Sequence, residues 1–318
     1  MTYHTRSAPA ATTYAQAGPL TDLSAYRTQL APLPETIADL CRVVQGVLMH
    51  TFWQGRDTRP LTEEHRQALY ARSAAVKLAA ILHLDDRPLT IARSPDRRLP
   101  ATSRDYSLLL VALLRHQRVP ARSRCGFVTY IAPQHYEEHW LVEYWDDAEG
   151  RWILVDPQMD ADQRAALNVT FDPLDIPRTR FLSSGAAWQH CRSGTLDPSL
   201  FGHLEDRGMH AIRCTLIRDL AALNRFEMQP WDRWGLMLPP DEMLNDADMT
   251  LLDTVAHATV GAVATPSADA VEALYASDSR LRPPYPWLVT PGIIPMTIED
   301  AACLSFRALR FAQGKLSI

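Results

Sequence analysis

Three residues have the types and the chain order of a nucleophile, a base and a group that orients the base: Ser103, His139 and Asp156. A hydroxyl nucleophile needs a base within hydrogen-bond reach, and that base needs a third group to fix its ring. We therefore predict that the fold brings these three side chains together as a catalytic set.

The residues around Ser103 predict the beginning of a buried helix. Thr102-Ser103-Arg104-Asp105 fits a capping box, with Thr102 as N-cap and Asp105 at the third helical position. Residues 106–116 are apolar nearly all round, which indicates burial on most sides. At the first helical position, Ser103 would lie among free backbone N–H groups at the positive end of the helix dipole, and these donors can stabilise an oxyanion.

Three strand-like runs follow this helix, at residues 121–131, 139–145 and 151–156. The last two are separated by a short polar turn that is typical of a hairpin. A helix followed by an antiparallel meander predicts an α+β fold rather than an alternating parallel sheet. The hairpin would place His139 beside Asp156, so that Asp156 bonds one ring nitrogen and the other nitrogen faces Ser103.

In order and spacing these motifs resemble the transglutaminase-like superfamily, which has the papain-related fold. The quoted runs are Ser103-Arg104-Asp105-Tyr106, Val119-Pro120-Ala121-Arg122, Gly126-Phe127, His139-Trp140 and Asp156-Pro157, within residues 75–160. The resemblance implies a buried nucleophile helix packed on an antiparallel sheet. The flanking helical parts are similar to a bacterial group of transglutaminase-like proteins to which no defined activity is attached.

Ser103 departs from the family pattern, in which a cysteine is the nucleophile. A cysteine beside a histidine supplies a thiolate at neutral pH, whereas a serine needs the base to remove its proton during attack. We expect an acyltransferase or hydrolase acting on an amide, ester or thioester of a small molecule or peptide, with water or an amine as acceptor. Two alternatives stay open: an inactive binding module, and a cysteine enzyme that uses Cys125.

Six further residues near the motifs are expected to shape the substrate pocket. They are Arg104, Cys125, Tyr130, Tyr136, Glu138 and Trp140. Each also has an ordinary role, as an ion-pair partner, a core residue or a solvated side chain. His135 and His139 are four residues apart, but the run is not HExxH and a strand begins at His139, so we expect neither a metal nor a cofactor.

Composition excludes several classes of protein. The chain has 47% hydrophobic and 22% charged residues and a net charge of −5, without the basic face of a nucleic-acid binder. Its apolar runs, such as residues 108–114, are too short to cross a membrane. Five scattered cysteines without a CxxC pair and an N-terminus without an apolar leader predict a reduced, cytoplasmic setting.

We predict four parts along the chain: a flexible arm at 1–20, N-terminal helices at 21–74, the transglutaminase-like core at 75–190, and a C-terminal helical region at 191–318 packed on the core. The expected helices outside the motif are 35–53, 62–83, 183–192, 208–225, 247–263, 267–277 and 297–313, and residues 84–101 are expected to form a loop. The aromatic run at 231–235 is interpreted either as a packed turn or as a lid.

Overall fold

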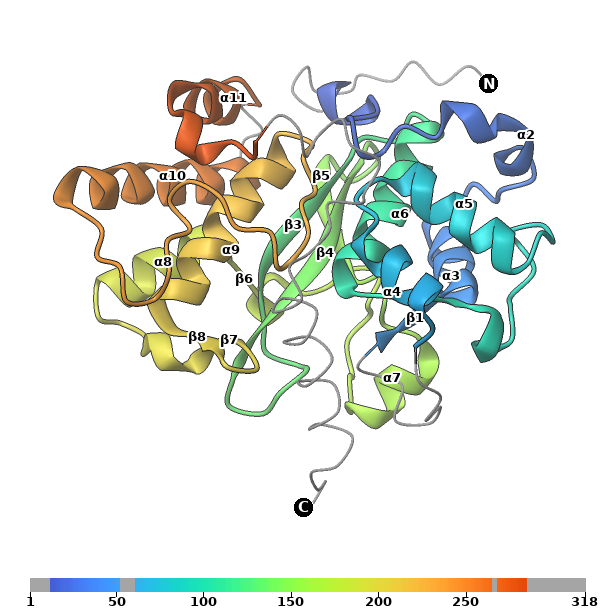
Figure 1. Cartoon of the computed structure of the whole chain (residues 1–318), viewed down its shortest axis with the longest axis horizontal. Coiled ribbons are helices and arrows are strands. Elements are labelled where there is room, and N and C mark those ends of the chain that lie inside the picture. The colour runs from blue at the N-terminus through green and yellow to red at the C-terminus, as the bar shows by residue number, and fades with distance from the viewer. Residues whose placement is uncertain (1–11, 52–60, 265–267, 285–318) are drawn as a thin grey trace.

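The computed structural model describes residues 12–51, 61–264 and 268–284 (Figure 1). The helices among them are α2 (Arg27–Leu30), α3 (Ile37–Val47), α4 (Glu63–Tyr70), α5 (Ala74–Leu84), α6 (Ser103–His116), α7 (Ala161–Ala166), α8 (Ser184–Arg192), α9 (Gly208–Leu223), α10 (Asp246–Ala264) and α11 (Ala268–Ser277). The strands are β1 (Leu48–His50), β2 (Leu99–Ala101), β3 (Ala121–Val128), β4 (Tyr136–Asp146), β5 (Arg151–Val155), β6 (Phe181–Ser183), β7 (Phe201–His203) and β8 (Asp206–Arg207).

The sheet is built around β3 and β4, which pair antiparallel with Gly126 opposite His139. β5 pairs antiparallel with β4, with Val155 opposite Val142. β6 extends the sheet beyond β3, and β7 pairs parallel with the beginning of β4. The α+β class and the antiparallel meander predicted from the sequence are therefore confirmed.

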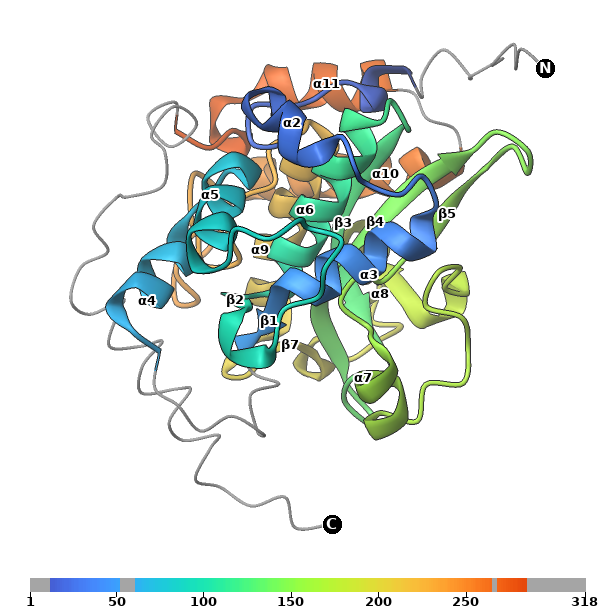
Figure 2. The same ribbon diagram turned by 90° about the vertical axis from the view of Figure 1, so that its right-hand side faces the viewer.

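Two groups of helices flank this sheet. In Figure 1, α3 to α6 lie on one side of β3 and β4, and α8 to α11 lie on the other. Figure 2 shows α3 passing beside α6, with which it is in contact. α6 is buried along most of its length, as its apolar sequence predicted, because it has α3, α5 and the sheet as neighbours.

Several elements differ from those predicted. The helix expected over 62–83 is two helices, because the Ser73 side chain accepts the N–H of Val76 and caps a new helix at Ala74. The helix expected over 35–53 ends at Val47, where β1 begins. The expected loop at 84–101 ends in β2, which pairs parallel with β1 and sets His50 opposite Ala101.

The C-terminal half follows the predicted pattern more closely. α8, α9, α10 and α11 occupy the expected positions to within a few residues. α7 and the short strands β6, β7 and β8 had no sequence signal. The helix expected over 297–313 lies outside the described residues. The run at 231–235 is a packed turn in which Asp232 is buried and bonded to Arg72, so the structure favours the packed-turn interpretation.

The described part of the predicted arm is packed rather than free. Tyr14 is buried, and its hydroxyl donates a hydrogen bond to the Leu223 carbonyl oxygen at 3.0 Å. Its ring meets Trp152 edge-on at 5.7 Å. This segment therefore joins the end of α9 to β5. Across the described ranges, the structure contains no helix that is long and apolar enough to span a membrane.

Charged side chains are buried beside the sheet in unusual number. Arg124 on β3 is fully buried and binds Asp219 on α9 through Nε at 3.0 Å and a terminal nitrogen at 2.9 Å. The same guanidinium contacts Glu143 on β4 at 3.2 Å. Asp219 also accepts the backbone N–H of Cys125 at 2.9 Å. One carboxylate thus links α9 to both the side chains and the backbone of β3.

Candidate functional site

The N-terminus of α6 presents two backbone donors beside Ser103. The Asp105 carboxylate accepts the Thr102 N–H at 3.0 Å and binds Lys77 at 2.9 Å, which fixes the first turn. The N–H groups of Ser103 and Arg104 donate no hydrogen bond to any residue that the structure describes. Because the Ser103 N–H lies at the positive end of the helix, it can stabilise negative charge on a carbonyl oxygen held against Ser103.

His139 and Asp156 form the pair that the sequence predicted. His139 Nε2 lies 3.0 Å from Asp156 Oδ2, and both side chains are buried. Tyr130 donates its hydroxyl to the same oxygen at 2.8 Å, and the Gln158 N–H donates to Oδ1 at 3.0 Å. Asp156 is therefore held on both oxygens.

These bonds decide the charge of Asp156. Burial alone would raise its pKa, but the charge of His139 and the hydrogen bonds from His139, Tyr130 and Gln158 outweigh burial and lower the pKa below its usual range. An ionised Asp156 requires a proton on His139 Nε2. In the neutral ring, Nδ1 is then an acceptor. It has no hydrogen-bond partner within the described ranges, so it is available as a base.

The packing of α6 sets Ser103 at the His139 end of β4. Near the end of the helix, Arg115 Nε donates to the Ala121 carbonyl at 3.1 Å. Two turns earlier, Ser107 Oγ donates to the Leu141 carbonyl at 2.9 Å. From Ser107, one more turn toward the N-terminus of α6, about 6 Å along the helix axis, reaches Ser103. From Leu141, two residues toward the N-terminus of β4, about 7 Å along the strand, reach His139. The helix and the strand thus bring both residues to one end of the sheet.

His50 also belongs to this region, and the sequence did not predict it. The β1–β2 pairing sets it opposite Ala101, two residues before Ser103, and its ring lies 6.5 Å from that of Tyr106. Burial, followed by the charge of the neighbouring His139, lowers the pKa of His50 to about 3. His50 is therefore neutral at physiological pH. Its position depends on a parallel strand pair that no local pattern reveals.

Three of the predicted pocket residues have polar or aromatic partners near the site. Tyr130 holds Asp156, as described above. The Tyr136 ring stacks on Phe201 with centroids 4.2 Å apart. Glu138 forms an ion pair with Arg218 at 2.8 Å and accepts the Thr215 hydroxyl at 2.7 Å.

The structure corrects the expectation for the other three, which lie in the interior. Arg104 has no exposed surface and donates to the backbone carbonyl oxygens of Glu227 at 2.8 Å and Arg72 at 2.6 Å. Cys125 and Trp140 pack in one buried cluster, and burial raises the pKa of the Cys125 thiol well above its ordinary value. These residues support the fold and have no surface to offer a substrate.

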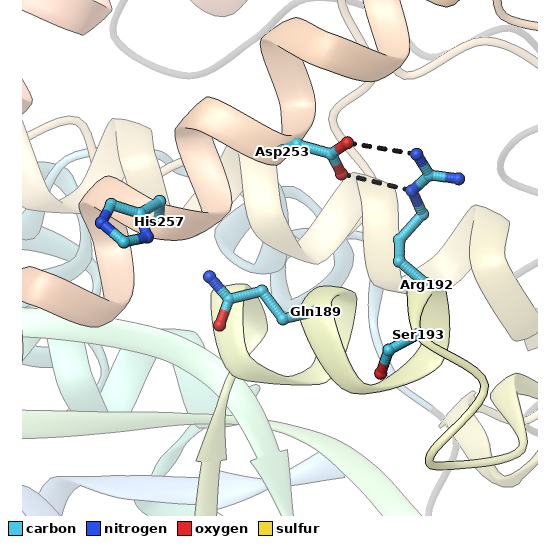
Figure 3. A pocket seen from close by; sticks show the side chains of 5 residues that line it. All are labelled: Gln189, Arg192, Ser193, Asp253 and His257. Carbon is cyan, nitrogen blue, oxygen red and sulfur yellow. Dashed lines mark hydrogen bonds and ion pairs between the residues drawn. The ribbon is translucent and has the colours of Figure 1, made fainter.

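Outside this region, a shallow pocket of about 380 Å³ opens between α8 and α10 (Figure 3). Its lining residues are Gln189, Arg192, Ser193, Asp253 and His257. Asp253 is bound by Arg192 at 3.1 and 3.2 Å and by the Trp188 indole N–H at 2.7 Å, so its carboxylate is occupied. Within the described residues, no group of three or more His, Cys, Asp or Glu side chains is arranged to hold a metal ion.

The fold and site together define an α+β protein with a serine at the start of a buried helix and a His–Asp pair at the same end of an antiparallel sheet. Residues 55–157 match the family model of the transglutaminase-like superfamily. This segment contains Ser103, His139 and Asp156. Over this segment the chain is therefore similar to a transglutaminase-like core, as the sequence motifs indicated.

The wider comparisons are distant. A solved structure described as a candidate cysteine protease from Cytophaga hutchinsonii is 12% identical, with a TM-score of 0.33. The match covers 56% of this chain and 47% of that one, so it spans about half the length of that structure. No curated protein matches the chain in sequence.

Proposed function

We propose that this protein is an acyltransferase or hydrolase in which Ser103 attacks an amide, ester or thioester. The observation that carries the proposal is the state of His139: Nε2 is bound to a carboxylate at 3.0 Å, and Nδ1 has no bond among the described residues. A base oriented in this way at the N-terminal end of α6 is what a serine nucleophile requires. The proposed substrates are small-molecule or peptide acyl compounds, and the proposed setting is the cytoplasm.

In the proposed reaction, His139 Nδ1 takes the proton from Ser103 Oγ as the oxygen bonds to the substrate carbonyl carbon. The N–H group of Ser103 receives the developing oxyanion. Asp156 stabilises the imidazolium, which then protonates the leaving group and leaves an acyl-enzyme. Water or an amine attacks that ester in the reverse sequence. A neutral His50 beside His139 favours the base, because a second positive charge there would oppose protonation.

Labelling with a fluorophosphonate probe tests this function. The wild-type protein is expected to react at Ser103, identified by peptide mass spectrometry. Ser103→Ala and His139→Gln are expected to lose labelling, whereas Cys125→Ala is expected to keep it. Inactivation of ester turnover by iodoacetamide, with activity surviving in Ser103→Ala, would instead support the cysteine alternative. The buried position and raised pKa of Cys125 oppose that alternative.

One observation favours a binding module without catalysis. His139 is only 3% exposed, so a substrate carbonyl has little direct access to its ring in this conformation. A catalytic protein must open this region when the substrate binds. Absence of both probe labelling and turnover of activated esters, in protein shown to be folded, would reject the enzyme and leave the binding module.

A further inference from the structure

A second set of nucleophile, base and orienting carboxylate lies at the beginning of α9. His210 stands between the other two: Nδ1 is 2.8 Å from Asp206 Oδ1 on β8, and Nε2 is 3.6 Å from Cys214 Sγ. His210 and Cys214 are four residues apart on α9, so both side chains lie on one face of the helix. Asp206 is itself held by Arg233 at 2.6 Å.

The charges around this set favour a thiolate paired with an imidazolium. Hydrogen bonds to Asp206 and then to Cys214 raise the pKa of His210 to about 9. Burial would raise the pKa of Cys214, but the hydrogen bond to His210 and the charges of Arg233 and Arg218 outweigh it, so the pKa is lowered. Arg218 is buried, and its Nε–H has no hydrogen-bond partner in the described part of the chain.

The other described cysteines behave in the opposite way. Burial raises the pKa of Cys41 to about 12 and that of Cys191 to about 11, and it raises the pKa of Cys125 well above its ordinary value. Since the thiolate is the reactive form of cysteine, Cys214 differs chemically from these three. They provide comparators within the same molecule.

A small pocket leads to the set from the surface. It has a volume of about 340 Å³, and Asp206, His210 and Pro240 are among its lining residues. Cys214 has no exposed surface, so its sulfur lies one side chain behind the pocket wall formed by His210. Access to the sulfur from this pocket therefore requires the imidazole of His210 to move aside.

We propose that Cys214 is a thiol-oxidation site for hydrogen peroxide or another small hydroperoxide, with His210 and Asp206 as its positioning residues. The thiolate sulfur bonds to one peroxide oxygen, and the O–O bond breaks. The leaving hydroxide, or the alkoxide of an organic hydroperoxide, takes the Nε2 proton of His210 and departs as water or as an alcohol. The sulfur is oxidised by two electrons to a sulfenic acid, and the peroxide is reduced.

Trapping of the sulfenic acid with dimedone, measured for each cysteine by peptide mass spectrometry, tests the proposal on the folded full chain. After peroxide treatment, Cys214 is expected to be trapped at least about tenfold faster than Cys41 and Cys125. His210→Gln is expected to slow trapping about tenfold, because it removes the partner of the thiolate. His190→Gln, at an exposed position near the end of α8, is the matched control and is expected to retain the wild-type rate.

Folding of each variant is checked by thermal melting, and Asp206→Asn provides a second variant that keeps the imidazole. It is expected to slow trapping in the same direction. The proposal is overturned if Cys214 reacts no faster than Cys41 and Cys125, reacts only in denaturant, or reacts equally in both variants and the wild type. Fluorophosphonate labelling of Ser103 is expected to be unchanged in Cys214→Ser, so failure of one proposal leaves the other standing.

Discussion

In the imidazole of His139, Nε2 is hydrogen-bonded to Asp156, whereas Nδ1 can accept a proton. Asp156 produces this difference between the two nitrogens. Its carboxylate accepts from His139, Tyr130 and the Gln158 backbone, so it stays ionised and selects the ring tautomer. The orientation of the base therefore depends on a buried charge and not on the shape of the ring alone.

Asp156→Asn is expected to reduce acyl transfer or ester turnover by about 10³-fold or more, because an amide at this position selects the wrong tautomer of His139. Steady-state kinetics with an activated ester measure this effect. Tyr130→Phe is the matched control: it removes one donor to Asp156 and leaves the charge, so a loss below about tenfold is expected. Equal losses in the two variants would mean that Asp156 has no separate role.

His50 is expected to make stability depend on pH. Its folded pKa of about 3 lies below the ordinary value of about 6.5, so between these values the unfolded chain binds one more proton than the folded chain. The free energy of unfolding therefore falls as pH falls through this window, by up to about 1.4 kcal/mol per pH unit.

Urea unfolding at pH 7, 6, 5 and 4 measures this slope. His50→Gln is expected to flatten it, and His116→Gln, at an exposed position on α6, controls for the loss of a histidine. If His50→Gln keeps the wild-type slope, the imidazole is not held neutral in the folded protein.

At the residue scale, the sequence predicted the pair of His139 and Asp156 because each carries a local signal, one at a strand start and one before a proline. Arg104 could not be assigned in the same way. Its partners are the backbone carbonyls of Arg72 and Glu227, which are remote in sequence. Nothing in the local pattern separates an arginine at a helix start that faces a substrate from one that faces the core.

The elements of the fold differ in how much they could be predicted. β3, β4 and β5 are long enough to show strand patterns, and the turn between the last two is polar, so their order was clear. β2 and β6 to β8 are at most three residues long and exist because a partner strand is available. Strands as short as these have no periodicity of their own.

Gly126 shows how closely the elements around the site approach one another. A Cβ at this position would lie 2.6 Å from the Phe181 ring and 2.7 Å from the Leu182 carbonyl oxygen on β6. Gly126→Ala is therefore expected to destabilise the protein by about 1–3 kcal/mol. Because Gly126 is opposite His139, the variant is also expected to lower activity.

Urea unfolding and ester turnover, measured on the same preparation, check both effects. Gly150→Asn in the β4–β5 turn is the matched control, because that glycine has a φ of +63° and no neighbour within 4 Å. Asparagine tolerates this left-handed conformation. If Gly126→Ala leaves the free energy of unfolding unchanged, β6 does not pack against β3 in this way.

At the scale of the whole molecule, helix α9 is joined to the sheet through buried ion pairs as well as apolar contacts. Asp219 lies at such a junction, where it neutralises Arg124 and binds the β3 backbone. Loss of one member of a buried pair leaves an uncompensated charge in the interior. The packing of α9 on the sheet therefore depends on the charge of Asp219.

Asp219→Ala is expected to lower the free energy of unfolding by about 3–5 kcal/mol. The double variant Arg124→Met/Asp219→Leu is expected to recover part of that loss, because it removes the arginine left without Asp219, while Glu143 keeps its ion pairs with Arg122 and Arg178. Asp253→Asn, in the half-exposed pair with Arg192, is the surface control and is expected to cost less than about 1 kcal/mol. A small effect of Asp219→Ala in urea titrations would contradict the role of this junction.

The hydrogen bond from Tyr14 to the carbonyl oxygen of Leu223 has a consequence for how the protein folds during synthesis. During synthesis Tyr14 leaves the ribosome before α9, because its partner at the end of α9 is made more than two hundred residues later. The segment around Tyr14 therefore cannot dock on α9 while the strands of the sheet are being synthesised. Contacts that close so large a span of chain also slow folding, so this tyrosine is expected to dock among the last residues of the native structure.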